Sequence, residues 1–263
     1  MQQASTLLSP QASGLVDWRD GAAVTGQIGE TLAAHLSSIG ELSAEDRKAI
    51  SKVRGEVRLL RRHSDILVAG QVPNYSAVLI RGLLTRYSAR QDGTSQIHSF
   101  YIAGDTPSLE TIHIDYMDHN LGAAVDSTIG VVPHEELHSL MAERPNVLSL
   151  IWRESLIQAS VFREWLLRNS QLPAHSAMGH LFCEIFLRSR AAGQVEGDSC
   201  DFPVTQDMLA AALGLTSVHV NRTLQLLRES GMVDHKAGRL FVYDYERLAQ
   251  AAEFDPQYLH LRA

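Results

Sequence analysis

The chain has 263 residues, of which 45% are hydrophobic and 20% charged, and its formal net charge is −7 at pH 7. This mixture excludes a wholly disordered chain and fits one large domain or two modest ones. Two cysteines are too few for a disulfide framework, a Cys-rich zinc site or a four-Cys iron–sulfur cluster. Neither a membrane-spanning run nor a leader pattern is present, so we expect a cytoplasmic protein.

The N-terminal part changes from a featureless segment to a helical one. Residues 1–25 are rich in Gln, Ala, Ser and Gly and show little apolar periodicity, which predicts a flexible tail. A helical apolar pattern begins at Thr31. Ser43 followed by Asp46 predicts a capping box, in which each side chain satisfies a backbone N–H of the other residue, at the start of a short helix.

Seven short apolar segments follow, and turn residues separate them. Asp92-Gly93 between two alternating runs is the strongest hairpin signal among these turns. Short strands at this spacing predict an antiparallel sandwich or barrel. The predicted strands cover residues 57–60, 66–69, 77–80, 83–88, 96–102, 121–125 and 129–132.

A long helix is predicted after the strands, following a short helix at 135–143. It begins near Pro145 and continues to about Asn169, and it carries two apolar sets on different faces. Because a small barrel covers only one face, a second copy of the chain is the simplest cover for the other, and we expect a homodimer. The alternative is a core helix within one subunit. The predicted dimer seam is Leu148, Trp152, Leu156, Ala159, Phe162 and Leu166; the second set is Val147, Leu150, Ile151, Ile157, Val161 and Trp165.

A hinge at 169–175 leads through another amphipathic helix to the most informative part of the chain. Two short helices are predicted at 206–213 and 217–230, joined by a three-residue turn that contains Gly214. This is the spacing of a helix-turn-helix. A β-hairpin at 232–243 follows directly, which makes it the winged form of the motif.

The outward positions of the second helix carry side chains that suit base recognition. A major groove admits an α-helix, and Arg, Asn and Gln can read its donors and acceptors in pairs. The start of the first helix and two cations of the wing suit phosphate groups. The alternative is a merely solvated helix face. The predicted base readers are Ser217, His219, Asn221, Arg222 and Gln225, and the predicted phosphate contacts are Thr205, Gln206, Lys236 and Arg239.

In the order of its parts the chain resembles the CRP/FNR superfamily of bacterial transcription regulators. The specific motif is residues 215–224, which match the family's recognition helix. The resemblance implies an α+β fold with an antiparallel β-barrel of the cyclic-nucleotide-binding type, a long dimerisation helix and a C-terminal winged helix-turn-helix. It implies a homodimer that binds a palindromic operator on double-stranded DNA and contacts RNA polymerase. It also implies that the protein is not an enzyme. The implied domains are a tail at 1–25, a sensor barrel at 26–143, the dimerisation helix at 144–170 and the DNA-binding domain at 171–263.

The recognition helix departs from the family in two positions. Familiar members carry Glu, then Ser or Gly, then Arg as their base-reading set. Arg222 occupies the arginine position, but Val218 stands in place of the glutamate and Asn221 in place of the serine. Because valine cannot accept a hydrogen bond from cytosine, we expect an unusual operator half-site. His219 and Asn221 are predicted to supply the missing readout.

The sensor half departs from the family's cyclic-nucleotide motif, which is Gly-Asp-Phe-Phe-Gly-Glu followed by an Arg-Ser/Thr pair. The matching stretch at 104–110 keeps the first glycine and the aspartate but lacks the second glycine, and residues 117–127 contain no arginine. A cyclic phosphate would find neither a cation nor a complete nest of amides, so we expect neither cyclic AMP nor cyclic GMP. The residues predicted to contact an effector are Gly104, Asp105, Ser108 and Glu110.

Other cofactors and functions stay open as alternatives. The iron–sulfur branch of the family needs four cysteines, which this chain lacks, whereas haem is an alternative because histidines lie in or beside the predicted barrel. A regulator without an effector, whose barrel only dimerises or contacts polymerase, is one alternative function. A cupin-like metal enzyme is another, but its His-x-His pair with a following Glu is absent, so we expect no metal. The histidines are His98, His113, His119, His134 and His138.

Overall fold

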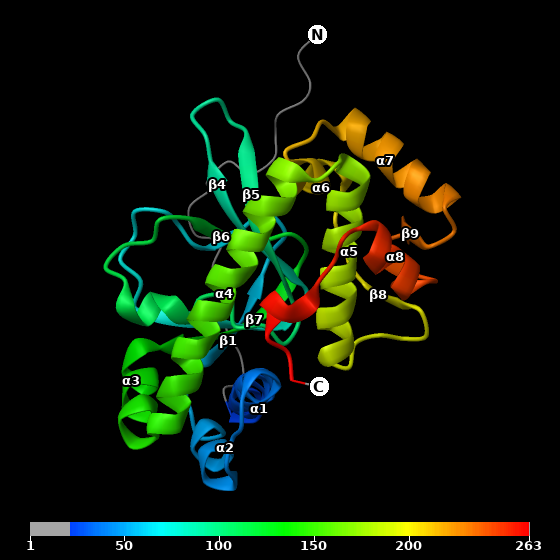
Figure 1. Cartoon of the computed structure of the whole chain (residues 1–263). Coiled ribbons are helices and arrows are strands. Elements are labelled where there is room, and N and C mark those ends of the chain that lie inside the picture. The colour runs from blue at the N-terminus through cyan, green and yellow to red at the C-terminus, as the bar shows by residue number, and fades with distance from the viewer. Residues whose placement is uncertain (1–21, 263) are drawn as a thin grey trace. The chain divides into compact units, whose positions relative to one another are not determined.

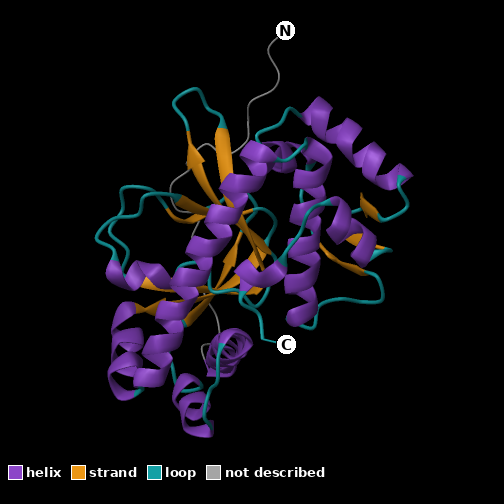
Figure 2. Ribbon diagram, viewed as in Figure 1, coloured by secondary structure: helices purple, strands orange, loops and turns teal. Residues whose placement is uncertain are grey.

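The computed structural model describes residues 22–262, which form a chain of mixed helices and strands (Figures 1 and 2). By their internal contacts these residues fall into two units, and the boundary lies inside one long helix, between Leu156 and Ile157. Among the described helices, none combines the length and the apolar composition that a membrane span requires.

The first helix, α1 (Ala22–Ile39), is longer than the sequence predicted. Residues 1–21 of the predicted tail lie outside the described residues, but residues 22–25 belong to this helix, which begins well before Thr31. Its apolar face also starts earlier, at Ile28, whose side chain is fully buried.

The capping box predicted at Ser43 and Asp46 is confirmed at the start of α2 (Ala44–Ile50). The Ser43 hydroxyl accepts the Asp46 N–H at 3.0 Å, and the Asp46 carboxylate accepts the Ser43 N–H at 3.1 Å. The same carboxylate accepts a hydrogen bond from Asn146 Nδ2 at 2.9 Å. The cap therefore also ties α2 to the first turn of α4 (Pro145–Gln171).

All seven predicted strands are present, and each predicted segment overlaps one observed strand. They form two antiparallel sheets with the orders β1-β7-β3 and β2-β6-β4-β5, which stay open rather than closing into one barrel. The predicted Asp92-Gly93 turn joins β4 to β5. The strands are β1 (Glu56–Leu60), β2 (Asp65–Leu67), β3 (Tyr75–Arg81), β4 (Leu83–Ala89), β5 (Ser95–Ile102), β6 (Asn120–Ala123) and β7 (Ser127–Pro133); a short turn of 3₁₀ helix, η1 (Leu109–His113), precedes β6, and α3 (His134–Glu143) follows β7.

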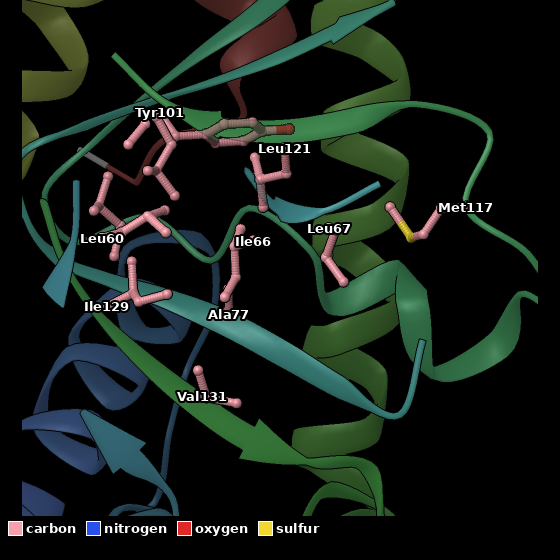
Figure 3. Close-up of a cluster of buried hydrophobic side chains, with 12 residues drawn as sticks. Leu60, Ile66, Leu67, Ala77, Tyr101, Met117, Leu121, Ile129 and Val131 are labelled. Atoms are coloured by element: carbon pink, nitrogen blue, oxygen red, sulfur yellow. The ribbon is translucent and has the colours of Figure 1, made fainter. Parts of the chain in front are cut away.

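The core of the N-terminal unit draws buried side chains from all seven strands (Figure 3). Leu60 of β1, Tyr101 of β5 and Leu121 of β6 belong to this single cluster. Helix α1 packs on the sheet that contains β7, where a Cβ at Gly130 would stand 2.6 Å from Cγ1 of Ile28. A side chain at position 130 would therefore collide with Ile28, and glycine allows helix and strand to pack this closely.

The C-terminal unit has the predicted winged helix-turn-helix, with additions that the sequence did not reveal. Only Leu172 and Pro173 separate α4 from α5, so the predicted hinge is short. The wing hairpin gains a third strand, giving the antiparallel order β8-β10-β9. The elements after α4 are α5 (Ala174–Ala191), β8 (Ser199–Asp201), α6 (Gln206–Leu213), α7 (Ser217–Glu229), β9 (Val233–Lys236), β10 (Arg239–Val242), α8 (Tyr245–Ala251) and η2 (Pro256–Leu259).

Candidate nucleic-acid interface

Two threonine caps and one glycine set the positions of α6 and α7. The Thr205 hydroxyl accepts a hydrogen bond from the Met208 N–H at 3.2 Å, and the Thr216 hydroxyl accepts one from the His219 N–H at 3.2 Å. Gly214 ends α6 in the left-handed region, with φ 66°. The predicted glycine turn is therefore confirmed, and each of the two helices begins at a threonine cap.

Helix α7 has one buried face and one exposed face, and it lies on the outside of the C-terminal unit (Figure 1). Its buried residues pack against α5, α6 and β9, which leaves the opposite face open to a ligand. The buried residues are Val220, Thr223, Leu224 and Leu227, and the exposed side includes Val218, His219, Asn221, Arg222 and Gln225.

Two predicted base readers are hydrogen-bonded to α6. The Ser217 hydroxyl donates to the Asp207 carboxylate, and the side-chain amide of Asn221 donates to Gln206 Oε1 at 3.4 Å. Asn221 and Gln206, predicted for a base and for a phosphate respectively, thus meet where α6 and α7 adjoin. These bonds hold the first turns of α7 against α6.

Arg222 is exposed one helical turn after Val218. Within residues 22–262 it takes part in no ion pair and no side-chain hydrogen bond. Its guanidinium is therefore free to donate to a ligand placed against the exposed face, and an arginine fork suits the two acceptors of guanine.

The two wing cations differ in their surroundings. Lys236 is exposed, and its Nζ lies 3.4 Å from the Asp234 carboxylate and 4.9 Å from the Phe241 ring centroid. Arg239 is half-buried and donates to the Asp201 carboxylate at 2.8 Å and to Glu196 at 3.3 Å. Arg239 is thus engaged with two anions in this structure, which leaves Lys236 as the more accessible of the two for a phosphate.

The residues predicted for the dimer seam lie on an exposed face of α4. The five large side chains of the set are 39–66% exposed, and Ala159 is exposed as well. The second apolar set of the same helix is buried. A continuous exposed apolar stripe of this kind is typical of an interaction surface. The exposed set is Leu148, Trp152, Leu156, Ala159, Phe162 and Leu166, and the buried set is Val147, Leu150, Ile151, Ile157, Val161 and Trp165.

Comparison with known proteins shows which proteins the chain is similar to. Residues 178–251 match the family model of the Crp-like helix-turn-helix domain. The chain is 21% identical over 234 residues to the transcriptional activator protein FnrL of Cereibacter sphaeroides, which covers 86% of this chain and 92% of that protein. It is 23% identical over 185 residues to the nitrogen fixation regulation protein FixK of Azorhizobium caulinodans, covering 70% and 74%. The chain is similar to regulators of the CRP/FNR superfamily.

Solved structures show the same fold. The structure of FixK2 from Bradyrhizobium japonicum has a TM-score of 0.65 at 19% identity and covers 75% of this chain and 96% of that one. A CRP-family transcriptional regulator of Thermus thermophilus has a TM-score of 0.57 at 14% identity and covers 74% and 96%. The predicted α+β fold is confirmed, and these likenesses support a DNA-binding transcription regulator and not an enzyme.

Three of the residues predicted for an effector are engaged within the chain. The Gly104 N–H donates to a carbonyl of β3 at 2.8 Å, and Gly104 has φ 96°. The Asp105 carboxylate accepts an N–H at the end of β5 at 2.8 Å. The Ser108 hydroxyl, fully buried, accepts an N–H of β3 at 2.7 Å. These three residues therefore shape the turn between β5 and η1.

The fourth residue, Glu110, pairs with Arg86 of β4. Arg86 also donates to the Pro107 carbonyl at 3.0 Å. Burial raises the pKa of the Glu110 carboxyl, and Arg86 opposes that rise. Burial and the Arg86 charge lower the pKa of His119 to about 4, so that His119, whose Nε2 lies 3.9 Å from the Glu110 carboxylate, is neutral at pH 7. A cation, Arg86, therefore does lie beside residues 104–110, the stretch predicted to contact an effector. It comes from β4 and not from residues 117–127.

Sequence reasoning missed Arg86, although a signal was available. An arginine inside the otherwise mostly apolar strand β4 is unusual unless it has a buried partner. The partner, Glu110, lies 24 residues later in the chain, beyond the reach of any local spacing rule.

The histidines weighed for haem form separate groups. The ring of His138 lies 6.4 Å from those of both His113 and His134, edge to face. His98 Nε2 lies 2.9 Å from the Ser88 hydroxyl on the neighbouring strand. In the part of the chain that the structure covers, no group of three or more His, Cys, Asp or Glu side chains is arranged to hold a metal ion.

Proposed function

We propose that this protein is a homodimeric, sequence-specific regulator of the CRP/FNR type in which α7 of each subunit enters the major groove of a palindromic operator. The observation that carries the proposal is the exposed face of α7, which presents the free Arg222 while its opposite face is buried. A regulator of this kind works in the bacterial cytoplasm, where the DNA lies, and contacts RNA polymerase once it is bound.

The test begins with an unbiased selection of duplex DNA bound by the purified protein. We expect a palindrome whose half-sites lie about one helical turn apart. Arg222→Ala should lower affinity for the selected site about tenfold or more, because an arginine fork on guanine contributes strongly to discrimination. Arg247→Ala, which changes an exposed arginine of α8, is the matched control. Equal affinities of Arg222→Ala and the unchanged protein would contradict the proposal.

The local charge balance sets the salt dependence. Residues 205–240 contain four cations and three anions, and the structure pairs Arg228 with Asp234 at 2.8 Å and Arg239 with Asp201. Few cations of each subunit are left for phosphates. Non-specific binding should therefore be weak and should fall only gradually as salt rises, because the salt dependence grows with the number of phosphates contacted, whereas the specific complex persists through its base contacts.

We propose further that residues 26–143 act as the sensor domain, 144–170 as the dimerisation helix and 171–263 as the DNA-binding domain. An effector would act by binding more tightly to one arrangement of the two recognition helices than to another. The internal hydrogen bonds of Asp105 and Ser108 favour the alternative in which the sensor domain binds no effector. A thermal-shift screen with cyclic nucleotides, haem and small aromatic compounds distinguishes the two, because a bound ligand raises the melting temperature.

A further inference from the structure

The first turn of α7 exposes an apolar side chain. Val218, the second residue of this helix, is 82% exposed and is the most exposed of the large apolar side chains that the structure describes. A β-branched residue does not favour a helix, so helix formation does not explain its presence. No described side chain of the C-terminal unit covers it. The explanation must lie in what the exposed face of α7 contacts.

Val218 shares that face with the polar residues that suit base recognition. Arg222 follows it by four residues, and Asn221 and Gln225 follow by three and seven, so the four side chains lie along one side of the helix. The N-terminal residues of a recognition helix are the ones that reach base edges. Val218 is therefore placed at the depth of the bases and not at the backbone.

The chemical groups in the major groove of DNA determine which base Val218 could contact. Valine has neither donor nor acceptor, so it cannot read the amino groups or the ring and carbonyl acceptors of the base pairs. The one apolar group that the major groove displays is the C5-methyl of thymine. We propose that Val218 is a specificity-determining residue that reads one thymine in each operator half-site by packing its methyl groups against that C5-methyl. This inference rests on the proposed function, in which α7 lies in the groove.

Deoxyuridine tests the contact, because it pairs as thymine does and lacks only the methyl group. Each thymine of the selected operator is replaced in turn, and affinity is measured for the unchanged protein and for Val218→Ala. We expect one position per half-site at which deoxyuridine weakens binding by the unchanged protein about fourfold, the effect of one buried methyl group. Val218→Ala should bind the two DNAs equally.

Two further variants serve as controls. Val218→Thr keeps one methyl group and should retain part of the discrimination. Leu226→Ala truncates another exposed apolar residue, 52% exposed and two turns further along α7, and should discriminate as the unchanged protein does. Alanine is the better helix former, so circular dichroism should show that Val218→Ala is folded.

The possible failures are distinguishable. A selected operator that loses affinity with Arg222→Ala, but at which no thymine can be told from deoxyuridine, overturns the role of Val218 and leaves the proposed function standing. Discrimination that persists in Val218→Ala also overturns it, because another side chain then reads the methyl group. If no common sequence is selected, the proposed function fails and this inference fails with it.

Discussion

Arg168 and Glu184 form an ion pair in which neither side chain has any exposed surface, with Nη1 of the arginine 3.6 Å from Oε2 of the glutamate. Arg168 lies in the last turn of α4 and Glu184 in α5. The same carboxylate accepts hydrogen bonds from the Trp165 indole at 2.9 Å and from the Tyr258 hydroxyl at 2.8 Å. One buried carboxylate thus joins the end of α4, α5 and the C-terminal η2 within the C-terminal unit.

The pair should be coupled energetically. Arg168→Met removes one of the two arginines that pair with the buried Glu184, the other being Arg188 at 3.2 Å, and we expect the free energy of unfolding to fall by about 3 kcal/mol. The double variant Arg168→Met/Glu184→Gln should lose less than the sum of the two single changes. Urea denaturation followed by circular dichroism measures both. Arg163→Met, on the exposed side of the same helix, is the control and should change little; additive losses in the double variant would show that the pair is not coupled.

His180, next to this pair, should make the unit sensitive to acid. Burial and the Arg168 charge lower the pKa of His180 to about 4 from an ordinary value of 6.5. Between these two pKa values His180 is protonated in the unfolded chain and neutral in the folded chain. The contribution of His180 to the free energy of unfolding is therefore complete above about pH 6.5 and is lost as the pH falls toward 4. The other charged groups that face the ring are Glu184 and Glu164, whose Oε1 lies 3.2 Å from Nε2.

The expected loss from this histidine between pH 7.5 and pH 5 is about 2 kcal/mol of unfolding free energy. In His180→Phe that part of the pH dependence should disappear. The comparison must be made between the two proteins at each pH, because His119 in the N-terminal unit also has a pKa of about 4 and acts with the same sign. Identical slopes for the two proteins would contradict the assignment.

The strands and the helix-turn-helix were predictable from sequence because each depends on local chemistry. Apolar segments separated by Gly, Asn and Asp located all seven strands of the N-terminal unit. Thr205 located the start of α6, and Gly214 and Thr216 located the two ends of the turn between α6 and α7, since each acts on backbone groups within a few residues. Such signals do not depend on what packs against them.

Buried charges were not predictable in this way. Arg168 reads in sequence as one more solvated helix residue, and its burial depends on Glu184 and on Tyr258, which lies 74 residues after that glutamate. Arg86 and Glu110 are a similar pair brought together by the sheet. Arg239, predicted as a phosphate contact, donates a hydrogen bond to Asp201 of β8, a strand that the predicted hairpin lacked. Two residues that pair across distant elements leave no pattern of local spacing in the sequence by which the pair could be predicted.

Gly214 should be replaceable only by residues that accept its backbone conformation. It has φ 66°, and no heavy atom lies within 4 Å of the place where a Cβ would stand, so the cost of a side chain comes from the backbone alone. Gly214→Ala should lower the free energy of unfolding by about 1 kcal/mol, and Gly214→Asn by less, because asparagine tolerates the left-handed region. Urea denaturation of both variants checks the order. Equal losses would indicate that the side chain, and not φ, sets the cost.

The exposed face of α4 should control assembly. Leu156 is 57% exposed at the middle of the proposed seam, and Leu156→Arg adds a charge that a second subunit would have to bury without a partner. Because the side chain is exposed within one chain, the variant should stay folded but become monomeric at micromolar concentration. It should also bind a palindromic operator at least tenfold more weakly, since only one recognition helix then engages at a time. Sedimentation velocity and a band shift measure the two effects. Ser149→Arg, at an exposed polar position on the same helix, is the matched control; a monomeric unchanged protein, or a dimeric Leu156→Arg, would place the subunit interface elsewhere.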